Sequence, residues 1–294
     1  MATGMWTSVS GASSRLQSVD MIANNLANSD TIGFKKDNPT FKEYLASLER
    51  EHEGVDIPRG PVKDKDLYPL DGRDQSFVVV DGTYTDFKSG ATKVTQSPLD
   101  IALGGAGFLE ILTPAGLRYS RNGSLKISAD GVLVTSDGSP VLSSHPGGLA
   151  ARQPANEIPN GIQRGVTAES MRVMSEVSRY INLRDRKGPI SINENGEIYS
   201  GDDFVAKLSV IEFIDKSKLR KAGGQSFENK DIMNISTDPV RTKVYQGVIE
   251  TSNVNPIEEM TNLIKANRLF EHDMKVLKTY GELLGKEAND IGKL

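Results

Sequence analysis

The stretch NPIEEMTNLIKANRLFEHDMKVLKTYGELLGKEANDI, residues 255–291, decides the fold class. Mostly apolar residues recur in it at intervals of three and four over more than four heptads and form a seam along one side of a helix. This spacing is typical of a helix that packs against another helix. Asn255 suits the N-cap, Pro256 the first helical position, and Glu258 the acid of a capping box. The seam consists of Met260, Leu263, Asn267, Phe270, Met274, Leu277, Gly281, Leu284, Ala288 and Ile291. The polar Asn267 either fixes the register of the helix pair or faces water at a wide seam.

The N-terminal segment carries the other half of this pattern. Its apolar stripe consists of Met5, Val9, Ala12, Leu16, Val19, Ala23 and Leu26. The opposite face is made of small, uncharged residues, including several serines, which lets another element approach the helix closely. Two alternatives stay open at this point. The helix is either packed on several sides in an assembly or forms an ordinary two-helix hairpin.

Between the two ends, the pattern changes to short strands separated by turns. Strands are expected at residues 77–80, 99–103, 108–112, 117–120, 132–135 and 205–213. Tight turns with a positive φ are expected at Asp81-Gly82, Asn122-Gly123, Asp130-Gly131, Asp137-Gly138 and Asn195-Gly196. The fold class is therefore expected to be α+β, with long N- and C-terminal helices paired as a coiled-coil-like layer and a central antiparallel all-β domain.

These patterns divide the chain into four parts. The expected parts are residues 1–48 with the N-terminal helix, 49–75 as an extended linker, 76–245 as the central β domain, and 246–294 with the C-terminal helix. Within the central domain we expect an insertion at about 143–187. It begins with a loop rich in Pro and Gly and ends with a helix at about 168–183.

Composition excludes several classes of partner. The chain has 35 Lys and Arg against 39 Asp and Glu, so it lacks the basic excess that nucleic acids or anionic membranes attract. No stretch reaches the roughly 18 apolar residues of a membrane-spanning helix, and the opening segment is too polar for a cleaved signal peptide. Cysteine is absent, which excludes disulfides and thiolate metal sites. We therefore expect neither nucleic-acid binding nor membrane insertion.

The sequence offers no pattern of a catalytic, cofactor or metal site. The three histidines, His52, His145 and His272, are far apart, and none has the spacing of metal ligands. The glycine-rich run at residues 104–107 lacks the further glycine and the helix of a dinucleotide-binding motif. The paired acids in the chain are typical of solvated loops. The chain is expected not to be an enzyme.

Three blocks of the sequence carry motifs that belong together. The first contains SGA at residues 10–12, NNLAN at 24–28 and TIGFK at 31–35. The second contains PLDIAL at 98–103, GFL at 107–109, YSRNG at 119–123 and DGVLV at 130–134. The third is QGVIETSNVNP at 246–256, which leads into the C-terminal helix. The blocks span both ends and the middle of the chain, and together they resemble the flagellar basal-body rod and hook protein family.

The resemblance implies a structural subunit of the periplasmic rod of the bacterial flagellum, which transmits torque by helix packing. It implies as partners other copies of the chain, other rod subunits and the flagellar type III export apparatus, without a cleaved signal peptide and without a cofactor. Within the family the chain is most similar to the proximal-rod type, and the distal-rod type is the nearest alternative. A periplasmic wall-acting enzyme or a coiled-coil binding module are more remote alternatives.

The assembly interface is expected on the two helical stripes and on the asparagines of the first block. Its expected residues are Met5, Val9, Ala12, Leu16, Val19, Ala23, Asn24, Asn25, Leu26, Asn28, Met260, Leu263, Asn267, Phe270, Met274, Leu277, Leu284 and Ile291. Burial of one large apolar side chain contributes roughly 1.5–3 kcal/mol, whereas ordering one residue costs about 1–2 kcal/mol. The terminal helices are therefore expected to be marginally stable until neighbouring subunits cover them.

Overall fold

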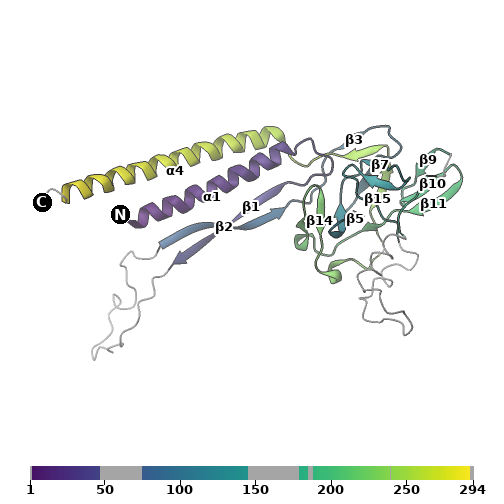
Figure 1. Ribbon diagram of the computed structural model, residues 1–294, viewed down its shortest axis with the longest axis horizontal. Helices are drawn as coiled ribbons and strands as arrows, with labels where there is room; N and C mark the ends of the chain where they lie inside the picture. Colours follow the sequence, from purple (N-terminus) through teal and green to yellow (C-terminus); the bar gives the residue numbers. More distant parts are fainter. Residues whose placement is uncertain (1, 47–74, 145–178, 185–187, 239, 292–294) are drawn as a thin grey trace, which may run out of the picture. The chain divides into compact units, whose positions relative to one another are not determined.

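The computed structural model describes residues 2–46, 75–144, 179–184, 188–238 and 240–291 (Figure 1). The chain forms two compact units. The helical unit comprises Met1–Ala27, Asp37–Tyr84 and Asn255–Leu294, and the β unit comprises Asn28–Lys36 and Thr85–Val254. Both ends of the chain thus belong to the helical unit, and the polypeptide enters and leaves the β unit more than once.

The helical unit is built on helix α1, Ala2–Ala27, and helix α4, Pro256–Ile291. The two helices pack side by side, and strands β1 (Asp37–Ala46) and β2 (Gln75–Thr85) pair with each other (Figure 1). The cap of α4 is the expected one, because Asn255 Oδ1 accepts hydrogen bonds from the backbone N–H groups of the second and third helical residues, at 3.1 and 3.4 Å. The two long terminal helices are confirmed.

The β unit consists of short antiparallel strands. Its largest sheet has the order β12-β5-β6-β14-β13, a second has the order β11-β10-β9, and the pairs β15-β4, β16-β3 and β7-β8 complete it. The strands are β3 (Thr92–Val94), β4 (Ile101–Gly104), β5 (Phe108–Thr113), β6 (Gly116–Ser120), β7 (Leu125–Ile127), β8 (Leu133–Thr135), β9 (Ile190–Ile192), β10 (Glu197–Ser200), β11 (Asp203–Lys207), β12 (Val210–Ile211), β13 (Arg220–Lys221), β14 (Ser226–Glu228), β15 (Lys243–Gln246) and β16 (Val248–Glu250). Two 3-10 turns, η2 (Lys216–Lys218) and η3 (Ile232–Asn234), lie between them. The α+β class is confirmed.

Two groups of buried side chains stabilise the β unit. The first is aliphatic and includes the fully buried Leu109, Leu133 and Ile198. The second is aromatic and is centred on Phe108, whose ring lies 5.6–5.8 Å from three other phenylalanine rings in edge-to-face geometry. Because these residues come from strands far apart in the sequence, their packing holds the sheets of the unit together.

Most of the expected strands are present. Those expected at 99–103, 108–112, 117–120 and 132–135 correspond to β4, β5, β6 and β8. The single strand expected at 205–213 is wrong, because the chain stops pairing with β10 after Lys207 and pairs with β5 from Val210 onward. A change of partner of this kind leaves the apolar pattern of the sequence uninterrupted, so the pattern alone predicted one strand.

The expected turns are confirmed at three glycines and wrong elsewhere. Gly131, Gly138 and Gly196 have φ of 81°, 81° and 77°, the left-handed backbone that tight turns require. By contrast, Gly123 does not have a positive φ. A Cβ there would lie 1.7 Å from the carbonyl oxygen of Ile101, so this glycine permits two segments to approach closely.

The first strand of the middle region belongs to the helical unit. The Asp81-Gly82 pair lies inside β2, so the turn expected there is wrong. Strand β2 pairs with β1, and the expected start of the central β domain at residue 76 falls within the helical unit. Strand β1 was not expected, because Pro39 and the charged residues around it weaken the strand pattern.

The helix expected at 168–183 is wrong over its last residues. Tyr180 and Asn182 form β-bridges with Leu142 and Val132, and residue 181 between them is buried in the aliphatic core. Residues 168–178 lie outside the described residues, as do residues 49–74 of the linker expected at 49–75 and most of the insertion expected at 143–187. The last strand-like stretch of that insertion is therefore part of the β unit itself.

The two sides of this insertion are joined at its base. The Ser143 N–H donates to the carbonyl of Arg179 at 2.9 Å, and Arg179 Nε donates back to the Ser143 carbonyl at 3.0 Å. The Arg179 guanidinium also forms a buried ion pair with Glu110 at 2.5 Å, and Ser209 Oγ donates to the same carboxylate at 2.6 Å. The base is thus held by contacts that do not require residues 146–177.

Deleting residues 146–177 and joining the ends with a short Gly-Ser linker is expected to leave the β unit folded. The unfolding free energy should change by less than about 1 kcal/mol, because loop closure depends only weakly on loop length. Deleting 143–187 instead removes Arg179 and two core side chains, Ile181 and Leu183, and should destabilise the unit by more than about 5 kcal/mol. Urea unfolding of both variants, followed by circular dichroism, distinguishes these outcomes. Equal stability of the two variants would contradict this assignment.

Candidate assembly interface

The apolar stripe of α1 is divided between covered and exposed positions. Ala12 is buried, and Val19 and Leu26 are half-buried, seven residues apart on one side of the helix. The alternate stripe residues Val9, Leu16 and Ala23, also seven apart, are exposed, and Leu16 is 47% accessible. Nothing is described of the Met5 side chain. Within the chain, α1 thus uses one half of its heptad stripe and leaves the other half open to solvent.

The stripe of α4 is divided in the same way. Leu263, Phe270, Leu277 and Leu284 are half-buried, whereas Met260, Asn267 and Met274 are exposed. The covered face is completed by Glu259, Ala266, Asp273 and Tyr280, each one residue before a position of the expected seam. The α4 face that is covered within the chain is therefore rotated relative to the seam expected from the sequence. The side chain of Ile291 lies outside the described residues.

An ion pair links the two helices. Arg15 Nε lies 2.5 Å from Asp273 Oδ2, and the position of a Cβ on Gly11 would lie 4.0 Å from the same oxygen. Both charged side chains are partly exposed, so the pair contributes at most about 1 kcal/mol. Its geometry nevertheless favours one register of α1 along α4. No local sequence pattern predicts this pair, because its residues are 258 positions apart.

The small face of α1 packs against the β1–β2 hairpin of the same chain. Ser14 is buried, and its Oγ donates to the Val78 carbonyl at 2.8 Å. Further along α1, Asn25 Nδ2 donates to the Asp37 carbonyl at 2.8 Å, and the Asp37 N–H donates to Asn25 Oδ1 at 3.1 Å. The amide of Asn25 thus pairs with one residue of β1 as a neighbouring strand would. Part of the small, uncharged face is accordingly covered within the chain.

The other two asparagines of the first block lie apart from this contact. Asn24 is exposed on α1. Asn28 is half-buried in the β unit, where its carbonyl accepts from the Thr31 N–H and its Oδ1 from the Thr31 hydroxyl, both at 3.2 Å. Asn28 therefore stabilises the turn after α1 through contacts within the chain, whereas it was expected at the assembly interface.

Replacing Ser14 by Asp is expected to destabilise the helical unit of the free chain. A carboxylate would be placed against the Val78 carbonyl in a buried site, which costs about 2–4 kcal/mol. Amide hydrogen exchange of α1 should become faster, while Ser13→Asp, at an exposed position on the next residue, should leave it unchanged. Equal exchange in the two variants would show that the hairpin does not cover this face.

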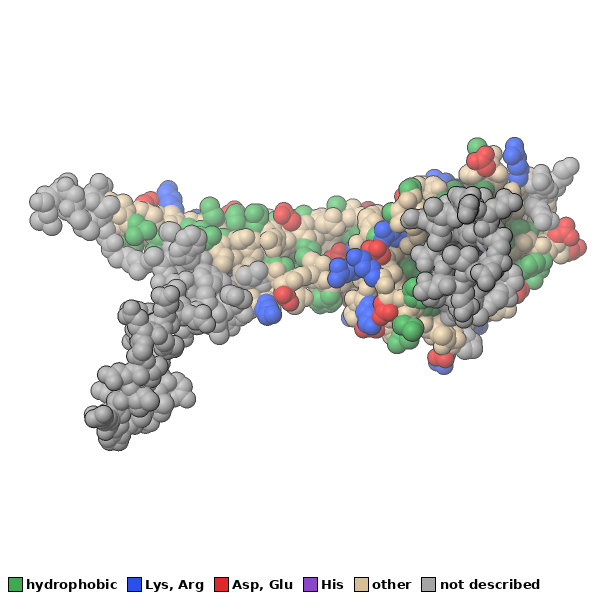
Figure 2. Space-filling view, turned by 60° about the horizontal axis from the view of Figure 1, so that its bottom comes forward, with side chains coloured by type: hydrophobic (Ala, Val, Ile, Leu, Met, Phe, Trp, Pro, Cys, Tyr) green, Lys and Arg blue, Asp and Glu red, His purple; other side chains and the backbone are tan. Residues whose placement is uncertain are grey.

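Several large apolar side chains of α4 remain exposed beyond the stripe. They are Ile257, Ile264, Leu269 and Leu283. In Figure 2, apolar side chains follow the length of the helical unit, interrupted by a few charged ones. Exposed apolar surface of this extent on a monomeric unit is typical of a surface that another protein covers.

The β unit contains a buried cluster of three charged residues. Lys35 Nζ lies 2.6 Å from Glu250 Oε1, and Arg121 Nη1 lies 3.3 Å from Glu250 Oε2. The residues are only 1–3% accessible, and burial lowers the pKa of Lys35 while the Glu250 carboxylate opposes the shift. Each residue comes from a different one of the three sequence blocks. The blocks therefore meet in space, a convergence that was not expected from the sequence.

Gly33 of the first block is required for the close packing around the same cluster. Gly33 has φ of 70°, and a Cβ there would lie 2.6 Å from the carbonyl carbon of Arg121. Its N–H donates to the backbone carbonyl of Glu250 at 2.8 Å. Only glycine combines this backbone conformation with this close approach.

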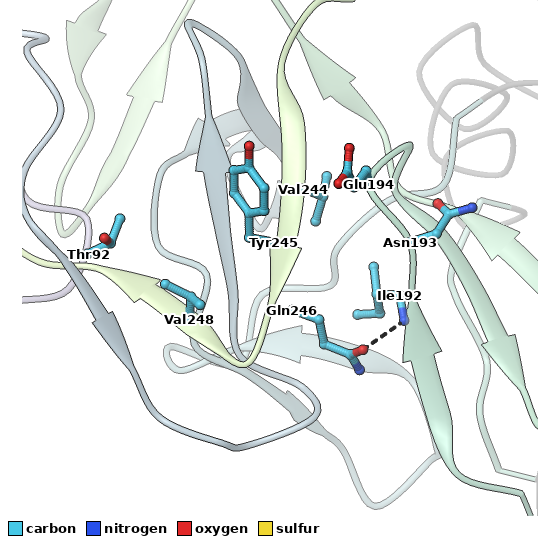
Figure 3. Close-up of a pocket in the computed structure, with 8 residues that line it drawn as sticks. All are labelled: Thr92, Ile192, Asn193, Glu194, Val244, Tyr245, Gln246 and Val248. Carbon is cyan, nitrogen blue, oxygen red and sulfur yellow. Dashed lines mark hydrogen bonds between the residues drawn. The ribbon is translucent and has the colours of Figure 1, made fainter.

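The surface of the β unit includes a shallow groove of about 570 Å³, shown in Figure 3. Residues that line it include Ile192, Val244 and Tyr245, and Gln246 Oε1 accepts from the Ile192 N–H at 3.2 Å. Of the described residues that line it, Glu194 is the one carboxylate, and it is exposed and pairs with Lys243. Among the described residues, no group of three or more acids and histidines is placed to hold a metal ion. Neither described helix is long and apolar enough to cross a membrane.

Paired terminal helices with exposed apolar stripes, joined to a separate β unit, are typical of a structural subunit of a larger assembly. Comparison with known families agrees with this class. Models of the flagella basal body rod protein, the flagellar hook protein FlgE/F/G D1 domain and the flagellar basal body rod FlgEFG protein C-terminal region match residues 5–35, 102–200 and 245–291. The chain belongs to the flagellar basal-body rod and hook protein family.

Individual relatives match over nearly the whole chain. The chain is 25% identical to the flagellar basal-body rod protein FlgF of Caulobacter vibrioides, with all of both chains covered. It is 28% identical to FlgG of Borreliella burgdorferi, with 98% of each chain covered, and 26% identical to FlgG of Bacillus subtilis, with 98% of this chain and 99% of the relative covered. These relatives are structural rod proteins, and the chain is accordingly a structural protein and not an enzyme.

Proposed function

We propose that the chain is a subunit of the periplasmic rod of the flagellar basal body, of the proximal-rod FlgF type, and that it transmits torque through its terminal helices. The observation that carries this proposal is the exposed half of each heptad stripe, represented by Leu16 on α1 and Met274 on α4. Each such side chain gains roughly 1.5–3 kcal/mol when a neighbour covers it. Repeated along two helices and around a rod, these contacts resist slip between subunits.

The coiled-coil-like pairing of the helices is part of the same proposal. The half-buried side chains between α1 and α4 have the three- and four-residue spacing of knobs-into-holes packing. The pair presents its remaining apolar positions outward, so the helices of neighbouring subunits can extend the packing sideways. Partners of this surface are other copies of the chain and other rod subunits.

Export through the flagellar type III apparatus fits the marginal stability expected of these helices. In a helix pair with only half of its apolar stripe covered, the free energy gained from packing barely exceeds the conformational entropy cost of ordering the residues. Such ends unfold easily enough to pass through a narrow channel, and neighbouring subunits stabilise them further after export. We therefore propose that the chain reaches the periplasm by this route, without cleavage of a signal peptide.

The FlgF type is favoured over the FlgG type by sequence features of the terminal segments. These are the Ser-Gly-Ala-Ser run at residues 10–13, the Phe-Glu pair at 270–271 and the Met-Lys-Val run at 274–276. The relatives include both types at comparable identity, so the distal rod remains the second candidate.

The position of the chain in purified basal bodies tests the proposal. Basal bodies extracted with detergent should contain an epitope-tagged chain, and electron microscopy with a gold-labelled antibody should place it near the inner end of the rod. Label only near the outer end would support the FlgG type instead. Absence from basal bodies of cells that assemble flagella with the tagged chain as sole copy would contradict a rod subunit.

A further inference from the structure

The segments that lead from the β unit into the helical unit meet at one place inside the β unit. These segments are the stretch after α1 that ends at Lys36, the start of the β unit after β2 at Asp86, and the stretch that ends before α4. Lys35, Lys36, Asp86, Lys88, Glu250 and Asn253 connect them by hydrogen bonds, and we call these residues the junction cluster.

Asn253 joins all three segments through one side chain. Its Oδ1 accepts from the Lys36 N–H at 2.7 Å, and its Nδ2 donates to the carbonyls of Asp86 at 2.8 Å and Lys88 at 3.2 Å. The Asp86 N–H in turn donates to the Lys36 carbonyl at 2.8 Å. An amide is suited to this position because it both donates and accepts, and neither Asp nor Leu of similar size does both.

The charged part of the cluster ties the same segments together. Lys35 Nζ donates to the Lys88 carbonyl at 2.8 Å as well as to Glu250, and Glu250 Oε1 also accepts from the Gly90 N–H at 2.9 Å. All of these contacts lie within the β unit. The end of α1 and the start of α4 are therefore attached, through residues 28–34 and 254–255, to one hydrogen-bonded cluster.

This attachment matters because the two helices are remote in sequence. Helix α1 ends at Ala27 and α4 begins at Pro256, so pairing them directly would require closure of a very long loop. In addition, nucleation of each helix is unfavourable, because forming the first turn fixes several residues for a single hydrogen bond. Once the β unit has folded, the loop is already closed, and the helix ends are held at a high effective concentration.

We infer that the junction cluster is a folding template for the helical unit, from which α1 and α4 pair toward the two free ends of the chain. The inference concerns the free chain and does not require that the chain is a rod subunit.

Hydrogen exchange of the full-length free chain tests the template. Asn253→Ala should accelerate amide exchange in residues 19–27 and 256–266 by about tenfold or more, because the helix ends are no longer held together. Exchange in β4, β5 and β6 should stay as in the wild type. Asn229→Ala is the matched control, since the Asn229 amide bonds within its own loop: it donates to the Asp231 carbonyl at 2.8 Å and accepts from the Asp231 N–H at 3.4 Å.

Two outcomes overturn the template. One is unchanged exchange in both helices of Asn253→Ala, and the other is an equal acceleration in Asn229→Ala. If Asn253→Ala also loosens β4–β6, Asn253→Asp decides, because it keeps the acceptor for the Lys36 N–H and loses both donated bonds. The template then requires faster exchange in the helices of Asn253→Asp with β4–β6 protected, and wild-type exchange in its helices overturns it. Rod formation does not enter either measurement.

Discussion

Replacing Glu250 by Gln is expected to lower the stability of the β unit by about 3–5 kcal/mol, because Lys35 and Arg121 would remain buried without their common counter-charge. For a unit of this size the melting temperature should fall by about 10 °C. Thermal unfolding of the full-length chain, followed by circular dichroism in the β region of the spectrum, measures the effect. The substitution keeps the shape of the side chain, so the loss reports charge and not packing.

The matched control for this prediction is Glu194→Gln in the same unit. Glu194 forms an exposed ion pair with Lys243 at 2.7 Å, and such pairs contribute at most about 1 kcal/mol. A melting temperature for Glu250→Gln within 2 °C or so of that of Glu194→Gln would contradict a stabilising role of the buried cluster.

Replacing Leu16 by Asp is expected to abolish assembly while leaving the free chain folded. Leu16 is exposed in the isolated chain, so a charge there meets water; in the proposed rod the same charge would be buried, at several kcal/mol per subunit. In cells that carry the variant as sole copy, flagella should be at least about 100-fold fewer. Counting flagella by electron microscopy, alongside thermal melting of the purified chain, gives both readouts.

Two further variants define what this result means. Leu16→Met keeps an apolar side chain at the same place and should assemble normally. Leu277→Asp should fail to assemble as well, but because Leu277 is half-buried on the α4 face that packs on α1, it should also loosen the helical unit of the free chain. Normal flagella with Leu16→Asp would exclude this stripe from the subunit contacts.

The two terminal helices could be predicted from the sequence because the patterns that indicate them are local. Asn255 and Pro256 predict where α4 begins, and the three- and four-residue spacing predicts a helix with one apolar side. Which half of the stripe is covered within the chain depends on how α1 rotates against α4. That rotation is influenced by Arg15 and Asp273, whose contact no local pattern indicates.

Long-range pairing determines the elements that local sequence patterns do not predict. Strand β1 contains Pro39 and charges, and it becomes a strand because β2, beyond residue 74, pairs with it. Ile181 fitted a helical spacing, yet Ile181 and Leu183 are both buried with Asn182 exposed between them, the period of a strand. The meeting of Lys35 and Glu250, 215 positions apart, follows from the tertiary fold alone.

The central claim is that the exposed half of the α1 stripe becomes buried between subunits in the rod. Because the chain has no cysteine, Leu16→Cys introduces a single thiol at this surface. Maleimide labelling is then compared between the purified free chain and purified basal bodies, with denatured basal bodies as the reference for complete labelling. The account predicts rapid labelling of the free chain and protection in intact basal bodies; equally rapid labelling in intact basal bodies that contain the variant would contradict it.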